Sequence, residues 1–265
     1  MRKDFERAYL TAHDNVAILT MNHPEVLNAA SPTMVRGLFQ ALQEIEKPDS
    51  GFRALVITGE GRGFCSGANL AEVAERRGEP AGVGSELDSF YHPFLRKLRD
   101  LRMPVVTAVN GAAAGIGMSI ALMGDIVCAA RSAYFLQAFA RIGLVPDGGS
   151  TWLLPRLIGF ARARELSLLA EKLLAEKALE WGLINRVFDD AALMEESLKL
   201  ATRLANGPTV SLATVRKLYW LSAHNSFDAQ LDCERQGQET AGRSEDFREG
   251  LRAFHEKRHA EFQGK

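Results

Sequence analysis

The first two thirds of the chain alternates short apolar runs with longer segments of mixed polarity. The apolar runs cover residues 16–21, 54–58, 105–109 and 126–129. They are short and almost continuously apolar, which is typical of strands covered on both faces of a sheet. The segments between them include apolar positions at helical spacing. The pattern therefore predicts an α/β fold.

The first helix is predicted directly after the first strand. Ser31 is a favourable N-cap, and Pro32 fits the first helical position, where its missing N–H is not needed. Val35, Leu38 and Leu42 then recur at the spacing of a helix with one buried face.

The segment before the third strand divides into two parts. Residues 77–85 are charged and then rich in glycine and proline, which predicts a mobile loop. Residues 86–101 return to a helical pattern, in which Pro93 either kinks the helix or starts a new turn.

The pattern changes again at about residue 191. Strand-like runs end there, and helical patterns follow at 194–204, 210–221, 227–240 and 246–262. The sequence therefore predicts a core over residues 1–190 and a helical region over residues 191–265.

One uncharged stretch, residues 104–123, is long enough to cross a bilayer, and Gly111 and Gly115 have the spacing of a helix-dimer face. Pro104, Asn110 and several glycines interrupt this stretch, and much of its apolar content is alanine. A buried strand, turn and helix is the favoured interpretation.

Bulk composition narrows the function classes. A chain of 265 residues with 46% hydrophobic and 25% charged content is typical of an ordinary globular protein. Its net charge of −1 provides no field that would gather nucleic acid or an anionic membrane. Cys65, Cys128 and Cys233 have no metal-binding spacing, and their odd number argues against a disulfide framework. The charged start MRKDFER does not fit a signal peptide, so a cytoplasmic location is expected.

Two glycine-bounded turns carry the candidate chemistry. GFCSGANL at 63–70 follows one apolar run, and NGAAAGIGM at 110–118 follows another. Each predicts a strand, a turn and a helix start, which leaves unpaired backbone N–H groups. Two such groups directed at one oxygen form an oxyanion hole. The nearby GEGRG at 59–63 matches neither a dinucleotide fingerprint nor a P-loop, and predicts a turn.

With these motifs the chain resembles the crotonase (enoyl-CoA hydratase/isomerase) superfamily over nearly all its length. The supporting segments are MNHPEVLNA, GFCSGANL, VNGAAAGIGMSIALMGDI, GLVPDGGSTWLLPRLIG and EDFREGLRAFHEKR. FARIGLVPDGGSTWLLPR and AGRSEDFREG are most similar to the ring-1,2-epoxyphenylacetyl-CoA isomerases within it. The resemblance implies a ββα spiral core. It also implies C-terminal helices that pack between subunits of a trimer, often stacked as a hexamer.

The resemblance also assigns residues to an acyl-CoA site. It implies oxyanion donors at the backbone N–H groups of Ala68 and Ile116. The residues implied for the coenzyme A and substrate slot are Val26, Ala29, Ser66, Ala68, Asn69, Leu70, Gly115, Ile116 and Phe139. Phe254 and Lys257 match tail residues that reach a neighbouring subunit's coenzyme A. Plain packing is the alternative for Ala29 and Leu70, and a solvated helix face is the alternative for Lys257.

The acid/base residues depart from the hydratase pattern. Hydratases of the superfamily place one glutamate three residues after the second donor and another about twenty residues further on. Ser119 and Phe139 stand at those positions, and neither can act as a carboxylate. The resemblance therefore argues against water addition by two glutamates.

A single acidic residue remains nearby. Asp147 coincides with the catalytic aspartate of the epoxyphenylacetyl-CoA and dienoyl-CoA isomerases, and one carboxylate suits the removal and return of a proton. Apolar walls such as Phe139, Leu144 and Trp152 are expected to raise its pKa. An Asx-turn or a helix N-cap ahead of Thr151 is the alternative interpretation.

Two further polar residues are weaker candidates. His92 precedes Pro93 on a helix that borders the acyl pocket in relatives, but a partly exposed or interfacial histidine is the alternative. Asp125 is interpreted as a structural residue at a strand start.

We therefore expect an acyl-CoA isomerase that forms a homo-oligomer, needs no metal or redox cofactor, and binds neither nucleic acid nor membrane. Its substrate would be an enoyl-CoA or a ring epoxide. The alternatives are an enoyl-CoA hydratase and an acyl-CoA-binding protein without efficient chemistry.

Overall fold

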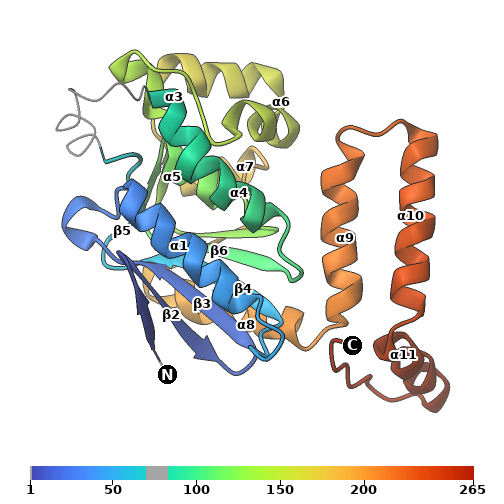
Figure 1. Cartoon of the computed structure of the whole chain (residues 1–265). Coiled ribbons are helices and arrows are strands. Elements are labelled where there is room, and N and C mark those ends of the chain that lie inside the picture. Colours follow the sequence, from blue (N-terminus) through green and yellow to red (C-terminus); the bar gives the residue numbers. More distant parts are fainter. Residues whose placement is uncertain (1, 70–82) are drawn as a thin grey trace.

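A seven-stranded sheet forms the centre of the computed structural model, which describes residues 2–69 and 83–265 (Figure 1). Its strands, in spatial order, are β1 (Lys3–Phe5), β2 (Ala8–His13), β3 (Val16–Met21), β4 (Ala54–Gly59), β6 (Val105–Val109), β8 (Ile126–Ala130) and β11 (Arg186–Phe188). From β3 to β11 the neighbours run parallel, whereas β1 and β2 are added antiparallel. Every residue of β4 and β6 is buried, which explains why these strands are continuously apolar.

A second sheet has four strands, in the order β10 (Leu173–Leu174), β9 (Tyr134–Leu136), β7 (Ala112–Ala114) and β5 (Gly63–Cys65). The chain visits the two sheets in turn, as β4 then β5, β6 then β7, and β8 then β9. Helices follow each of these pairs along the chain. This topology is the ββα spiral that the resemblance implies, and the predicted α/β class is confirmed.

Helices cover both faces of the large sheet. The α-helices of the described residues are α1 (Pro32–Ile45), α3 (Val83–Glu86), α4 (His92–Arg99), α5 (Ile116–Ala121), α6 (Ser150–Leu169), α7 (Ala175–Glu180), α8 (Leu193–Ala205), α9 (Thr209–Ser222), α10 (Phe227–Gly242) and α11 (Glu245–Glu256). Figure 1 shows α1 and α4 in front of the sheet and α8 behind it. Helix α8 packs on the sheet through contacts with β3, β4, β6 and β8, whereas α9 to α11 stand clear of it. The boundary at residue 190 stays a prediction.

Local signals predicted the helix starts well. Ser31 caps α1, and its Oγ accepts a hydrogen bond of 3.2 Å from the Met34 N–H. The last predicted helix, however, ends at Glu256 rather than at residue 262. Lys257 adopts a left-handed conformation, and the tail turns back so that the buried Asp246 accepts hydrogen bonds from backbone N–H groups at 263 and 264.

The helix around Pro93 is also more segmented than predicted. A π-turn at Leu87–Tyr91 separates α3 from α4, and the His92 N–H bonds to the Leu87 carbonyl five residues back. Pro93 lies in the first turn of α4, which matches its interpretation as the start of a new turn. Most of the loop predicted at 77–85 lies outside the described residues, and residues 83–85 are helical rather than loop.

The uncharged stretch 104–123 forms β6, β7 and α5, as the favoured interpretation predicted. Among the described residues, no helix has the length and apolarity needed to cross a membrane.

Helices α9 and α10 form a hairpin that is anchored to the body by several contacts, among them Arg53, which donates to the Thr209 hydroxyl and the Gly207 carbonyl. The Arg216 side chain, only 3% exposed, pairs with Asp125 at 2.7 Å and donates to the carbonyls of Leu98 and Leu101. Asp125 also accepts from the Val105 N–H at 2.7 Å, so its interpretation as a structural residue is confirmed. Another anchor is the stack of Trp152 on Trp220, whose ring centroids lie 5.1 Å apart.

Candidate active site

The two glycine-bounded turns lie side by side because the strands before them are neighbours. β5 and β7 run parallel, with Gly63 opposite Ala112 and Cys65 opposite Ala113. Parallel strands end at the same edge of a sheet, so the segments that follow them meet there. The pairing therefore brings residues 66–69 next to residues 115–118.

This approach is too close for side chains at two positions. A Cβ atom on Gly117 would lie 2.2 Å from the Cys65 carbonyl oxygen, so any other residue would force the turns apart. Gly67 has a φ of +111° and faces the Ala114 carbonyl, where a Cβ would lie at 3.3 Å. Glycine at these positions is required by contact and by backbone conformation.

The predicted oxyanion donors lie on these two turns. Ile116 is the first residue of α5, after Gly115. Within the described residues, no hydrogen bond uses the backbone N–H of Ala68 or of Ile116. Their neighbours are bonded, since Gly115 donates to Leu136 and Asn69 donates to Ala30. Two unpaired N–H groups on adjacent turns are the arrangement that an oxyanion hole requires.

The segment 26–30 forms one border of this region. Ser66 donates its N–H to the Leu27 carbonyl and its hydroxyl to the Val26 carbonyl, both at 3.0 Å. Ala30 pairs with Ala68 in an isolated parallel bridge. The predicted slot residues that the structure brings together here are Val26, Ala29, Ser66, Ala68 and Asn69.

The remaining predicted slot residues that the structure describes do not lie at this border. Phe139 is buried, and a Cβ atom on Gly115 would lie 3.6 Å from its ring, so it belongs beside the second turn. Leu70 lies outside the described residues. Phe254 is 79% exposed on α11, at the far end of the helical region from α5 (Figure 1). Phe254 and Lys257 therefore do not join the site of their own chain.

Three residues that support the site were not singled out from the sequence. The fully buried Asn28 donates to the carbonyls of Glu60 and Gly63, and Asn110 holds the same loop through the carbonyls of Gly59 and Gly61. Asn28 has a φ of +57°, which asparagine tolerates better than most residues.

Tyr91 is the third supporting residue, and its hydroxyl donates to the Ala30 carbonyl at 2.7 Å. Asn110, directly after β6, offered a sequence signal, whereas Asn28 lies in the loop after β3 and offered none. Tyr91 gave none, because its partner is 61 residues away.

Asp147 lies half-buried in the turn before α6. Its Oδ1 atom is buried, and no hydrogen bond from the described residues reaches its carboxylate. Burial raises the pKa of Asp147 to about 6, although the nearby His92 lowers it. Gly149 is the N-cap of α6, and no side chain caps this helix. The alternative interpretation of Asp147 as a helix cap is therefore wrong.

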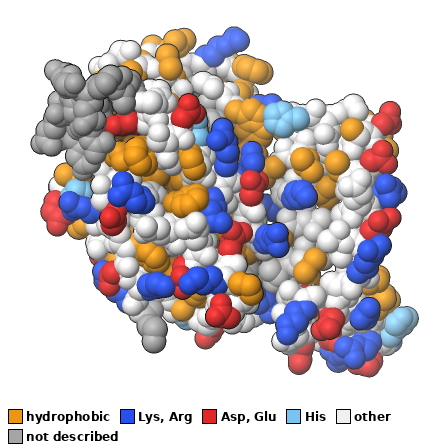
Figure 2. All heavy atoms as spheres, viewed as in Figure 1, with side chains coloured by type: hydrophobic (Ala, Val, Ile, Leu, Met, Phe, Trp, Pro, Cys, Tyr) orange, Lys and Arg blue, Asp and Glu red, His pale blue; other side chains and the backbone are white. Residues whose placement is uncertain are grey.

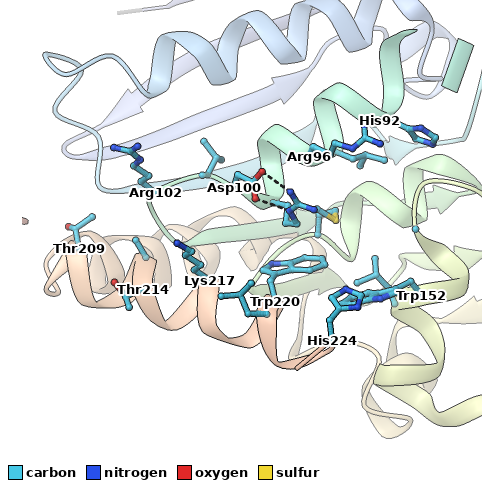
Figure 3. A pocket seen from close by; sticks show the side chains of 18 of the residues that line it. His92, Arg96, Asp100, Arg102, Trp152, Thr209, Thr214, Lys217, Trp220 and His224 are labelled. Carbon is cyan, nitrogen blue, oxygen red and sulfur yellow. Dashed lines mark hydrogen bonds and ion pairs between the residues drawn. The ribbon is translucent and has the colours of Figure 1, made fainter. Parts of the chain in front are cut away.

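A cleft of about 1150 Å³ opens beside Asp147, between the body and α9 (Figure 3). His92 and Gly148 line it, whereas Asp147, Ala68 and Ile116 lie outside its lining. Trp152, Trp220 and His224 gather at the same end, with His224 5.7 Å from the Trp152 ring. His92 also lies 3.0 Å from Asp88, one helical turn earlier. The cleft therefore borders the turn that carries Asp147 but does not include the candidate catalytic groups.

Comparison with known proteins places this arrangement in a family. A model of the enoyl-CoA hydratase/isomerase family matches residues 11–265. The chain belongs to this family, and the predicted resemblance is confirmed.

Individual relatives include both isomerases and hydratases by name. The 1,2-epoxyphenylacetyl-CoA isomerase of Escherichia coli (strain K12) is 46% identical over 94% of this chain and 95% of the relative. A probable enoyl-CoA hydratase of Rhodobacter capsulatus is 42% identical over 95% of this chain and 96% of the relative. The crystal structure of an enoyl-CoA hydratase from Polaromonas sp. JS666 superposes with a TM-score of 0.91 at 34% identity, covering 96% and 99% of the two chains.

The burial of Asp147 predicts an unusual pH dependence of stability. Its pKa is about 6 in the fold and about 4 when unfolded, so the unfolded state ionises first and stability falls as pH rises between these values. Asp147→Asn removes this charge. Its Tm should exceed that of the wild type above about pH 7, and the difference should vanish near pH 4.

Asp100→Asn is the control, because Asp100 is an aspartate of the neighbouring cleft whose pKa is lowered by its hydrogen bond with Arg99. This variant should show no gain in Tm at high pH. A Tm difference for Asp147→Asn that does not change with pH, measured by scanning calorimetry, would contradict the burial of an ionisable Asp147.

Proposed function

We propose that the protein is an acyl-CoA isomerase in which Asp147 is the single acid/base. One observation supports the proposal most directly. The Asp147 Oδ1 atom is buried without a hydrogen-bond partner among the described residues, and its turn packs against Ile116, whose backbone N–H is unpaired there. A pKa of about 6 leaves Asp147 mostly ionised at neutral pH, yet basic enough to hold a proton.

The mechanism follows from these groups. Asp147 removes a proton from a carbon of the acyl chain, and the electron pair moves into the thioester carbonyl to form an enolate. The N–H groups of Ala68 and Ile116 stabilise the resulting oxyanion. Asp147 then returns the proton at another carbon, so that the product is an isomer of the substrate. No metal or redox cofactor takes part in this sequence.

The substrate we propose is an enoyl-CoA or the ring epoxide of an aromatic acyl-CoA, which would open to an oxepin. Similarity to the Escherichia coli 1,2-epoxyphenylacetyl-CoA isomerase supports the second.

Hydration is the second candidate function, favoured by the name of the Rhodobacter capsulatus relative. Ser119 and Phe139 oppose it, because both are buried side chains without a carboxylate where hydratases place their glutamates. Binding without chemistry would leave the buried and unpartnered Asp147 unexplained.

We further propose that the chain forms a homo-oligomer through its helical region. Tyr219, Phe227 and Phe254 on α9, α10 and α11 are each more than three-quarters exposed. Figure 2 shows scattered hydrophobic side chains on the surface of this region that faces the viewer, whereas its outer edge carries acidic and basic side chains. In such an assembly Phe254 and Lys257 would reach a neighbour's coenzyme A. The three cysteines are free thiols, which supports a cytoplasmic location.

The central test replaces the base. Asp147→Asn keeps the size of the side chain and removes its basicity, so turnover of 3-enoyl-CoA and ring-epoxide substrates should fall by at least about 10²-fold. Acyl-CoA affinity, measured by calorimetry, should stay within about threefold, because the slot is mostly backbone. Asp100→Asn should retain full activity. Near wild-type turnover by Asp147→Asn would refute the proposal and direct attention to His92.

The absence of a glutamate pair predicts weak hydration. Given crotonyl-CoA, the purified protein should consume the enoyl thioester far more slowly than it isomerises its preferred substrate. The fall in enoyl-thioester absorbance provides the measurement. Rapid hydration at neutral pH would show that the assignment of Ser119 and Phe139 as replacements for the glutamates is mistaken.

Assembly can be measured independently of activity. Light scattering should give a mass of about three or six times the 29.1 kDa chain. Truncation after residue 205, which removes α9 to α11, should abolish the oligomer and expose apolar surface. A well-behaved monomer of the full chain would count against this inference.

A further inference from the structure

A chain of buried hydrogen bonds ends at the backbone of Asp147. The Ser119 hydroxyl lies 3.1 Å from the Asp147 carbonyl oxygen and 2.7 Å from the Ser150 hydroxyl. The Gln137 amide nitrogen lies 3.2 Å from that same Ser150 hydroxyl. The side chains of Ser119, Gln137 and Ser150 are all fully buried.

The direction of this chain is fixed by its two ends. The Asp147 carbonyl can only accept a hydrogen bond, so Ser119 must donate to it. The Ser119 oxygen is then free to accept from the Ser150 hydroxyl, which in turn accepts from the Gln137 amide. Aligned hydrogen bonds in a buried site polarise and strengthen one another. The hydrogen bonds of Gln137 and Ser150 therefore strengthen the one that Ser119 donates to the Asp147 carbonyl.

The same turn is packed directly on α5. Gly148 has a φ of +59°, and a Cβ atom there would lie 2.3 Å from Ile116 Cδ1 and 2.8 Å from Ser119 Cβ. The backbone after Asp147 thus rests on the first turn of the helix that begins with the Ile116 donor. No side chain larger than hydrogen fits between them.

We propose that Ser119 is a positioning residue that fixes Asp147 relative to the oxyanion donor on α5. This inference rests on the proposed function. Ser119 occupies the position where hydratases place a catalytic glutamate, but its hydroxyl points to a backbone carbonyl of the neighbouring turn. One helical turn therefore carries the Ile116 N–H and, through Ser119, also holds the residue that moves the proton.

The network also carries a cost that simple packing does not explain. The Gln137 Oε1 atom is buried without a hydrogen-bond partner among the described residues. A buried acceptor without a partner destabilises the folded state. Stability alone does not explain a glutamine at this position. The Gln137 amide is, however, the donor that orients the Ser150 hydroxyl, and Ser150 in turn orients Ser119.

Removal of the Ser119 hydroxyl tests the proposal. In Ser119→Ala the Asp147 turn should move slightly and admit water. A misplacement of about 1 Å costs about 10²-fold in rate, so kcat should fall by about 10- to 100-fold while KM changes less than about threefold. The acid limb of the pH–rate profile should also shift below about pH 6, because better solvation lowers the pKa of a carboxyl.

Thr107→Val is the matched control. The buried Thr107 hydroxyl donates to the Ala121 carbonyl at 2.8 Å, at the other end of the same helix. Its loss should lower Tm to a similar extent as Ser119→Ala, with kcat and the acid limb unchanged. Ser150→Ala, which leaves the Ser119 donor in place, should show the same effects as Ser119→Ala in weaker form. If Ser119→Ala does not fold, Ser150→Ala tests the proposal in its place.

A double variant separates this inference from the proposed function. If Ser119 acts through Asp147, then adding Ser119→Ala to Asp147→Asn should lower the residual rate by less than about twofold. An unchanged kcat and acid limb in Ser119→Ala would overturn the positioning role, and so would an equal loss in the Asp147→Asn background. Full activity of Asp147→Asn alone would instead overturn the proposed function.

Discussion

The close contact between Gly117 and the Cys65 carbonyl is the constraint on which the site depends. It brings the ends of β5 and β7 together with no side chain between them. The N–H groups of Ala68 and Ile116 come next to each other only because this contact is possible. The rest of the active site is then built outward from α5, first through Gly148 and then through Asp147.

The helical hairpin is attached to this core by fewer and more polar contacts. Arg216 is buried and hydrogen-bonded to the carbonyls of Leu98 and Leu101, so its removal would leave Asp125 without its ion-pair partner and those carbonyls without this donor. The stack of Trp152 on Trp220 then sets the width of the cleft near His92. Motion of α9 would thus be transmitted first to the aromatic end of the cleft.

Features set by short-range patterns could be predicted from the sequence. The four buried strands and the start of α1 at Pro32 follow from local apolar runs and from one capping serine. The end of α11 at Glu256 could not, because it depends on a tail that folds back onto Asp246. Resemblance predicted Asp147 and the two donors as site residues, whereas the supporting roles of Asn28, Tyr91 and Ser150 depend on contacts between distant segments.

The unpartnered oxygen of Asp147 has a consequence for how the protein would bind a ligand. A carboxylate on the surface must lose its water when a substrate arrives, and that loss weakens binding. The Asp147 Oδ1 atom is already shielded from solvent in the folded protein. The free-energy cost of removing this oxygen from water therefore lowers the stability of the fold and does not weaken ligand binding. A ligand that offers a proton to this oxygen meets an acceptor that is already prepared for it.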